Sequence, residues 1–199
     1  MRIQARKDLP MRTDLLVQWT LRVMQSLQPV APWAETFPES AATLVQIAES
    51  SPLYPSETDG VRRTLALLLS VANFESALKP DAEGDCDARD RDKSGMCKKG
   101  ARGHSLCMFQ VGDSNLKALG TNREAILTDL AVCTRSALTL IRISFGVCRS
   151  RAPEDQLAQY AAGGGSCGGP KGEGLLESRH RMAKARWIFA NQSLLTGLE

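Results

Sequence analysis

The sequence lacks the charge pattern of a nucleic-acid-binding protein. Its 25 Lys and Arg residues are scattered among 22 Asp and Glu residues, for a formal net charge of +3, and no basic cluster is interleaved with aromatic residues. Nucleic-acid-binding domains usually concentrate positive charge on one face. We therefore expect no nucleic-acid partner, although a mildly basic protein is suited to an anionic surface.

Long apolar runs are missing as well. The longest, around residues 65–72, is too short to cross a bilayer. The basic N-terminal segment, residues 1–24, has polar interruptions where the apolar part of a signal peptide would lie. We expect no membrane span and no signal peptide. The 199 residues are enough for one domain with a core, or for one domain plus a small extension.

Apolar periodicity predicts a mainly helical chain. Helices are expected over residues 11–27, 40–50, about 58–79, 121–145 (long enough for two helices) and 175–195, with a short one near residue 158. Thr121 and Glu124 predict a capping box. Residues 80–105 are polar and charged, which predicts a long loop or a small, irregular β region. Loops of this length are often functional.

The most apolar predicted helix ends in a carboxylate, Glu75. Eight of the nine residues from Leu65 to Asn73 are apolar or small, and the helix must end before Pro80. The negative end of the helix dipole and the loss of water would both raise the pKa of Glu75. A raised pKa suits a general acid in glycoside cleavage. The alternative is a solvated glutamate on the outer edge of the helix.

Three short motifs follow one another along the chain. They are Glu75-Ser76 with Pro80 and Ala82, then Cys107-Met108-Phe109-Gln110, then Tyr160-Ala161-Ala162-Gly163. In this order, over about residues 62–165, they resemble the lytic transglycosylase family, whose soluble members have a lysozyme-like fold. We therefore expect a mainly α, lysozyme-like (α+β) domain over residues 56–199. It would carry one irregular loop or small β region after the catalytic helix, and an N-terminal helical extension over residues 1–55.

The resemblance implies a substrate and a role for each matching residue. Glu75 would act as acid and then as base on the β-1,4 bond between N-acetylmuramic acid and N-acetylglucosamine in peptidoglycan. Gln110 would line the cleft, Tyr160 would hold Glu75 or the sugar, and Ser105 is the nearest match to a serine before the glutamine turn. The 6-hydroxyl of the substrate would attack, giving a 1,6-anhydro product without a second carboxylate or a cofactor.

The chain departs from the family pattern at two positions, and other functions stay open. Cys107 replaces the usual Gly, so the turn needs a different backbone conformation or anchor, and Ala162 replaces the usual Asn. Asp81 or Asp85 could instead activate water, which would make the protein a muramidase of the goose-type lysozyme sort. A non-catalytic wall-binding or virion structural protein with the same fold is the third alternative.

Six cysteines indicate disulfides and an oxidising destination. Fifteen pairings are possible. Sequence order favours Cys86–Cys97, Cys107–Cys133 and Cys148–Cys167, each of which would brace part of the expected cleft. With no signal peptide expected, delivery to the periplasm and cell wall by a phage virion is favoured over secretion, and virion or secretion-apparatus proteins are candidate partners.

Metal binding is not favoured. Asp90, Asp92 and Ser94 match the opening of an EF-hand loop, but Ala101 stands where the bidentate Glu is needed. A zinc set would be Cys86, Cys97, His104 and Cys107, whose spacing lacks the paired short gaps of structural zinc sites.

Overall fold

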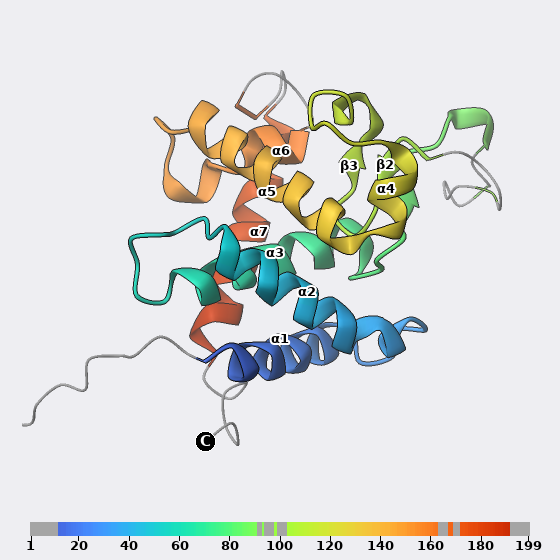
Figure 1. Cartoon of the computed structure of the whole chain (residues 1–199). Helices are drawn as coiled ribbons and strands as arrows, with labels where there is room; N and C mark the ends of the chain where they lie inside the picture. Colours follow the sequence, from blue (N-terminus) through green and yellow to red (C-terminus); the bar gives the residue numbers. More distant parts are fainter. Residues whose placement is uncertain are drawn as a thin grey trace, which may run out of the picture.

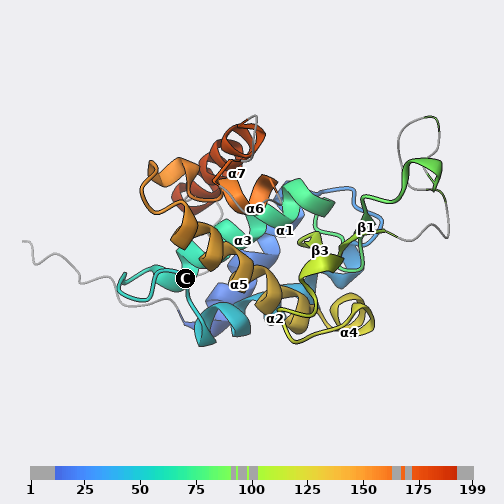
Figure 2. The same cartoon turned by 90° about the horizontal axis from the view of Figure 1, so that it is seen from above.

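The helix that was predicted to end in a carboxylate is α3 (Gly60–Ser76), and it lies in the middle of the protein in the computed structural model (Figure 1, Figure 2). The structure describes residues 12–90, 93, 98, 103–162, 167–168 and 172–191. Nine consecutive residues of α3, Thr64–Ala72, are buried, and three other helices of the protein pack against α3. The helix ends where Ala77 and Leu78 adopt positive φ angles of 53° and 66°.

The other elements are arranged around α3. α1 (Thr13–Leu27), α2 (Phe37–Ser50) and α7 (Glu173–Ala190) pack directly on it, and α7 makes the most extensive contact. α5 (Leu130–Val147) packs against α2 and against the short α6 (Ala158–Ala162), which in turn lies on α7. Short 3-10 helices occur at Ala34–Thr36, Ala88–Asp90, Asp113–Asn115 and Pro153–Asp155.

One continuous core joins the N-terminal helices to the rest. Trp19 and Met24 of α1, with Phe37 and Leu44 of α2, are completely or almost completely buried in the same cluster as the leucines of α3. The predicted division into residues 1–55 and 56–199 stays a prediction.

A small antiparallel sheet follows α3, as the polar segment predicted. Its strands are β1 (Glu83–Gly84), β2 (Ser105–Leu106) and β3 (Val111–Gly112), in the order β1-β2-β3. Leu106 pairs with Glu83 on one side and with Val111 on the other. The predicted fold class is therefore confirmed: the protein is mainly helical, with one small irregular β region after the helix that carries Glu75.

The helical region after residue 121 is two helices, but its predicted cap is wrong. α4 (Arg123–Thr128) begins after Asn122, whose side-chain oxygen accepts a hydrogen bond of 2.9 Å from the amide of Ala125. Asn122 thus caps the helix in place of Thr121, the residue before it, for which the cap was predicted. An amide side chain caps a helix as well as a hydroxyl does. α5 has its own cap, Asp129.

Two of the three predicted disulfides are confirmed. Cys107 bonds to Cys133 with the Cα atoms 6.2 Å apart, and Cys148 bonds to Cys167 at 5.3 Å. The first ties the turn after β2 to the start of α5, and the second ties the end of α5 to the segment after α6. Cys97, the predicted partner of Cys86, lies outside the described residues.

α5 is the one helix in the described part of the chain that is long and apolar enough to cross a membrane. It packs as a core helix of this protein, since Ala137, Leu138 and Ile141 are buried in the common core and Cys133 is bonded to the turn after β2. The arrangement is consistent with the expectation of no membrane span.

Candidate active site

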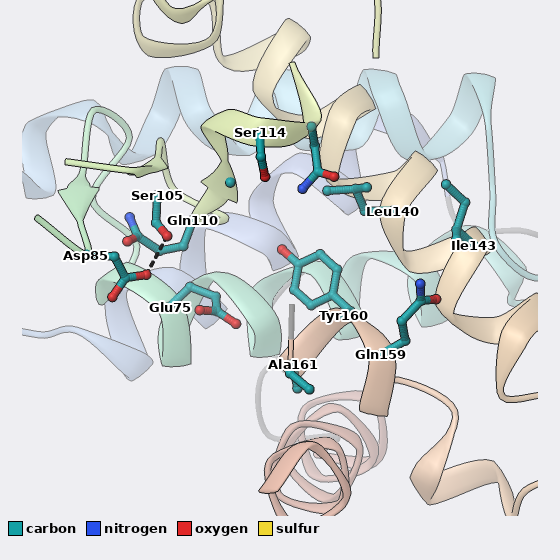
Figure 3. A pocket seen from close by; sticks show the side chains of 13 residues that line it. Glu75, Asp85, Ser105, Gln110, Ser114, Leu140, Ile143, Gln159, Tyr160 and Ala161 are labelled. Carbon is teal, nitrogen blue, oxygen red and sulfur yellow. Dashed lines mark hydrogen bonds between the residues drawn. The ribbon is translucent and has the colours of Figure 1, made fainter. Parts of the chain in front are cut away.

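A cleft of about 580 Å³ opens between the sheet, α5 and α6, and Glu75 is one of the residues that line it (Figure 3). All four residues that the sequence singled out for a site line it, although they are spread over 86 positions: Glu75, Ser105, Gln110 and Tyr160. Figure 3 shows Asp85, Ser105 and Gln110 at one end of the cleft with Glu75, Tyr160 in the middle, and Leu140, Ile143 and Gln159 at the other end.

Glu75 is in the last turn of α3, and its side chain is 17% exposed. One carboxylate oxygen, Oε1, accepts hydrogen bonds from Nη2 and Nε of Arg181, at 2.8 and 3.1 Å. Arg181 lies on α7 with its side chain 8% exposed. Nothing in the sequence marks Arg181 as a partner of Glu75, because an arginine on a helix 106 positions away carries no signal of where that helix packs.

Burial raises the pKa of Glu75 above its ordinary value of 4.5. The charge and the hydrogen bonds of Arg181 act in the opposite direction, and the negative charges of Asp85 and Glu177 raise the pKa further. The loss of water outweighs the arginine, so the direction expected from the sequence holds. The setting is nevertheless an ion pair at the edge of the core and not a purely apolar pocket.

The turn that carries Gln110 is fixed to the end of α3. The hydroxyl of Ser76 donates to the carbonyl of Met108 at 2.7 Å, and the amide of Met108 donates to the carbonyl of Pro80 at 3.0 Å. Cys107 has a φ of 62°, in the left-handed region that favours glycine. Cys107 therefore keeps a glycine-like backbone conformation and is anchored by its disulfide to Cys133.

The side chain of Gln110 lies over β1 and needs a glycine there. Its Nε2 donates to the carbonyl of Cys107 at 3.1 Å. A Cβ atom added to Gly84 would lie only 2.2 Å from Oε1 of Gln110. Gly84 therefore leaves the room in which the amide sits, a role that nothing in the sequence indicated.

Tyr160 reaches the cleft from α6 and bonds to the same turn. Its hydroxyl donates a hydrogen bond to the carbonyl of Phe109 at 2.6 Å, and its amide donates to the hydroxyl of Ser144 on α5 at 3.1 Å. Burial raises the pKa of the Tyr160 hydroxyl well above 10.0, and the negative charge of Glu75 adds to this. Tyr160 thus stays a neutral donor beside Glu75.

Of the two carboxylates weighed as water activators, only Asp85 is in the cleft. Its Oδ2 accepts a hydrogen bond from the hydroxyl of Ser105, which is drawn in Figure 3, and its φ of 54° marks a tight bend after β1. Asp81 does not line the cleft: its side chain is 69% exposed and lies 3.6 Å from Nζ of Lys79. The prediction that Asp81 could take this role is therefore not supported by its position.

The far end of the cleft is more apolar. Ile143 of α5 is 46% exposed there, next to Leu140 and Gln159. Oε1 of Gln159 is buried and has no hydrogen-bond partner among the described residues. Nothing in the sequence had marked any of these three residues for a site.

The metal alternatives fall largely on undescribed residues. Asp92, Ser94 and Ala101 lie outside the described residues, and Asp90 lies 3.8 Å from Nε of Arg89. The zinc alternative is wrong at Cys107, whose sulfur is bonded to Cys133. Among the residues that the structure describes, no group of three or more His, Cys, Asp or Glu side chains could hold a metal ion.

No family model, curated protein or solved structure matches the chain.

Proposed function

We propose that the protein cleaves the β-1,4 bond between N-acetylmuramic acid and N-acetylglucosamine in peptidoglycan, as a lytic transglycosylase. The observation that carries the proposal is the position of Glu75: a largely buried carboxyl group with a raised pKa lines a cleft that it shares with Gln110, Ser105 and Tyr160. A cleft lined by polar side chains suits a glycan strand, and a carboxyl that holds its proton suits a general acid.

The proposed reaction needs only one carboxyl group. Glu75 gives its proton to the glycosidic oxygen as the bond between that oxygen and C1 of the N-acetylmuramic acid residue breaks. The 6-hydroxyl oxygen of the muramic acid then bonds to C1, and its proton passes to the Glu75 carboxylate. The product carries a 1,6-anhydro ring, no water is consumed, and Glu75 returns to its acid form. Gln110 and Tyr160 orient the sugar and the acid.

The setting that best fits this activity is the cell wall, reached through the periplasm. Two disulfides in the described part of the chain support an oxidising destination. A formal net charge of +3 favours binding to the anionic wall. Delivery within a phage virion, with virion proteins as partners, is the setting we favour, and secretion is the alternative.

A hydrolytic muramidase is the second candidate, and Asp85 is the observation that favours it. Asp85 lies beside Glu75 in the cleft and is held by Ser105. In inverting glycosidases the second carboxylate activates a water molecule on the far side of the sugar. In the muramidase reaction Asp85 would be this second carboxylate.

The test is digestion of purified peptidoglycan by the wild type, Glu75→Gln and Glu35→Gln, with mass analysis of the released fragments. Glu35 is an exposed glutamate in the 3-10 helix Ala34–Thr36 and controls for the loss of one negative charge. Fragments lighter by one water than hydrolytic ones, released by the wild type and Glu35→Gln but not by Glu75→Gln, are the expected result.

Reducing-end fragments that disappear in both Glu75→Gln and Asp85→Asn would support the muramidase instead. If the wild type released nothing but sedimented with peptidoglycan, the enzymatic proposal would fail and a wall-binding or virion structural role would replace it.

A further inference from the structure

The ion pair between Glu75 and Arg181 raises a question, because a general acid must hold its proton beside a cation that favours the ionised form. We propose that Arg181 is a positioning residue that holds Oε1 of Glu75 and leaves Oε2 to deliver the proton, with Glu177 setting the strength of that hold. This inference rests on the proposed function, and it deepens the account of the same site.

The geometry gives the two oxygens of Glu75 different surroundings. Nε and Nη2 of Arg181 both bond to Oε1. Oε2 has no hydrogen-bond partner among the described residues, although the side chain lines the cleft. A carboxylic acid held in this way accepts the arginine's hydrogen bonds through its carbonyl oxygen and carries its proton on the other oxygen. The proton is then on the oxygen that Arg181 does not hold.

Arg181 itself is held firmly. Its backbone carbonyl accepts a hydrogen bond of 2.7 Å from the buried hydroxyl of Ser70, which ties α7 to α3 at this position. Its guanidinium carbon lies 5.6 Å from the centre of the Phe74 ring. Ser70 thus fixes the backbone of Arg181, while Phe74 and Glu177 contact its guanidinium. A guanidinium held in this way can fix the rotamer of the carboxyl group that it binds.

Glu177 explains how the acid keeps its proton. It lies one helical turn before Arg181 and accepts a hydrogen bond from Nη1 at 3.0 Å. When Glu75 is protonated, the negative charge of Glu177 alone balances the positive charge of Arg181. The cluster of Arg181, Glu177 and Glu75 is electrically neutral when Glu75 is protonated, and buried charge is tolerated best when it is balanced.

Two further groups face Glu75, and the charged one acts in the same direction as Glu177. Asp85 approaches from the segment after β1, and its negative charge favours the protonated form of Glu75. Tyr160 approaches from α6 as a neutral hydroxyl whose own pKa is raised by the charge of Glu75. Arg181 is thus the one cation among the groups that act on Glu75 in the described structure.

Removing the positive charge of Arg181 and removing the negative charge of Glu177 should shift the pKa of Glu75 in opposite directions. Arg181→Met removes the cation, so the pKa of Glu75 should rise. Glu177→Gln frees the charge of Arg181 to act on Glu75 alone, so the pKa of Glu75 should fall. Arg179→Met is the matched control, because Arg179 is on the same helix but is paired with Asp155 at 2.7 Å and does not contact Glu75.

The experiment is an NMR titration of the full chain labelled with ¹³C at the glutamate side-chain carboxyl, with the Glu75 signal assigned by its absence in Glu75→Gln. The expected result is a higher Glu75 midpoint in Arg181→Met, a lower one in Glu177→Gln and no change in Arg179→Met. Midpoints that stay unchanged, or move together, in the first two variants would overturn the inference. Glu177 is 45% exposed, so Glu177→Gln should fold even if Arg181→Met does not.

Peptidoglycan digestion by the same variants tests the positioning role. We expect kcat of Arg181→Met to fall about tenfold to a hundredfold at unchanged KM, because a misplacement of about 1 Å can cost a hundredfold. Arg181→Lys, which keeps the charge and one hydrogen bond, should recover part of the loss. Full activity in Arg181→Met would overturn the role. If Glu75→Gln were fully active, the proposed function would fail instead, while the NMR titration would still report on the Arg181–Glu75 contact.

Discussion

The hydroxyl of Tyr160 donates a hydrogen bond to the backbone carbonyl of Phe109, 2.6 Å away and 51 positions earlier in the chain. This bond joins α6 to the turn that carries Gln110, so two walls of the cleft are held at a fixed spacing over Glu75. Because the acceptor is a backbone carbonyl, the position of the Tyr160 ring does not depend on which side chain residue 109 carries.

Tyr160→Phe removes this bond while keeping the ring. We expect the free energy of unfolding to fall by about 1 kcal/mol, the net value of an ordinary hydrogen bond. Release of peptidoglycan fragments should fall by a larger factor than this destabilisation can explain at a temperature where both proteins are folded. Urea unfolding and digestion at 25 °C measure the two effects. Activity equal to the wild type would mean that the spacing of the two walls does not matter for the reaction.

Gly84→Ala should displace the side chain of Gln110 from its position over β1 without unfolding the protein. The added Cβ would overlap Oε1 of Gln110 at 2.2 Å, and the flexible end of that side chain can swing away. We therefore expect Gly84→Ala and Gln110→Ala to lower activity by similar factors, and the double variant to lower it no further, because both changes remove one interaction.

Gly146→Ala is the matched control for that series. Gly146 lies in α5, where an added Cβ would meet nothing within 4 Å. This change should leave activity unchanged and raise stability by up to about 1 kcal/mol, because Ala favours helix over Gly. Additive losses in the Gly84→Ala, Gln110→Ala double variant would show that Gly84 acts on something other than Gln110.

The disulfide and the backbone of Cys107 contribute separately to the turn. Removing the Cys107–Cys133 bond should cost about 2–4 kcal/mol. The pair Cys107→Gly, Cys133→Ser should be more stable than Cys107→Ala, Cys133→Ser by about 1 kcal/mol, since a φ of 62° is free of steric cost only for glycine. Denaturant unfolding of the two double variants measures the difference. Equal stability, or a more stable alanine variant, would show that the turn relaxes once the disulfide is gone.

What the sequence predicted correctly depends on local pattern, and what it missed depends on packing. A long apolar helix that ends in a carboxylate is visible at Glu75, because the residues before it are consecutive. The order of the cysteines was enough for two disulfides, since each confirmed pair closes a segment of modest length: Cys107–Cys133 spans 26 positions and Cys148–Cys167 spans 19.

The roles of Arg181 and Gly84 at the site could not be predicted from the sequence, for a physical reason. Arg181 is buried on α7, whereas Leu176 and Trp187 of the same helix are exposed. Hydropathy therefore does not mark the face of α7 that packs against α3, and this contact could not be predicted. Gly84 is required by one atom of a side chain 26 positions away, and no periodicity records such an approach. The cap at Asn122 was misplaced by one residue, because Thr, Asn and Asp cap helices almost equally well.

The protonation of Glu75 makes the stability of the protein depend on pH. The folded protein holds the proton of Glu75 more tightly than the unfolded chain does, since burial raises this pKa above 4.5. The stabilisation that comes from protonation is therefore fully present below pH 4.5 and is lost as the pH rises through the folded-state pKa. Glu75→Gln, which is neutral throughout, should gain stability relative to the wild type as the pH rises from 4 to 7.5. The control Glu35→Gln should show no such trend, because its side chain is exposed. Urea unfolding of all three proteins at several pH values, with the disulfides intact, measures the difference. A Glu75→Gln variant that lost stability relative to the wild type over this range would show that Arg181 outweighs burial, and that Glu75 rests as a carboxylate in the free protein.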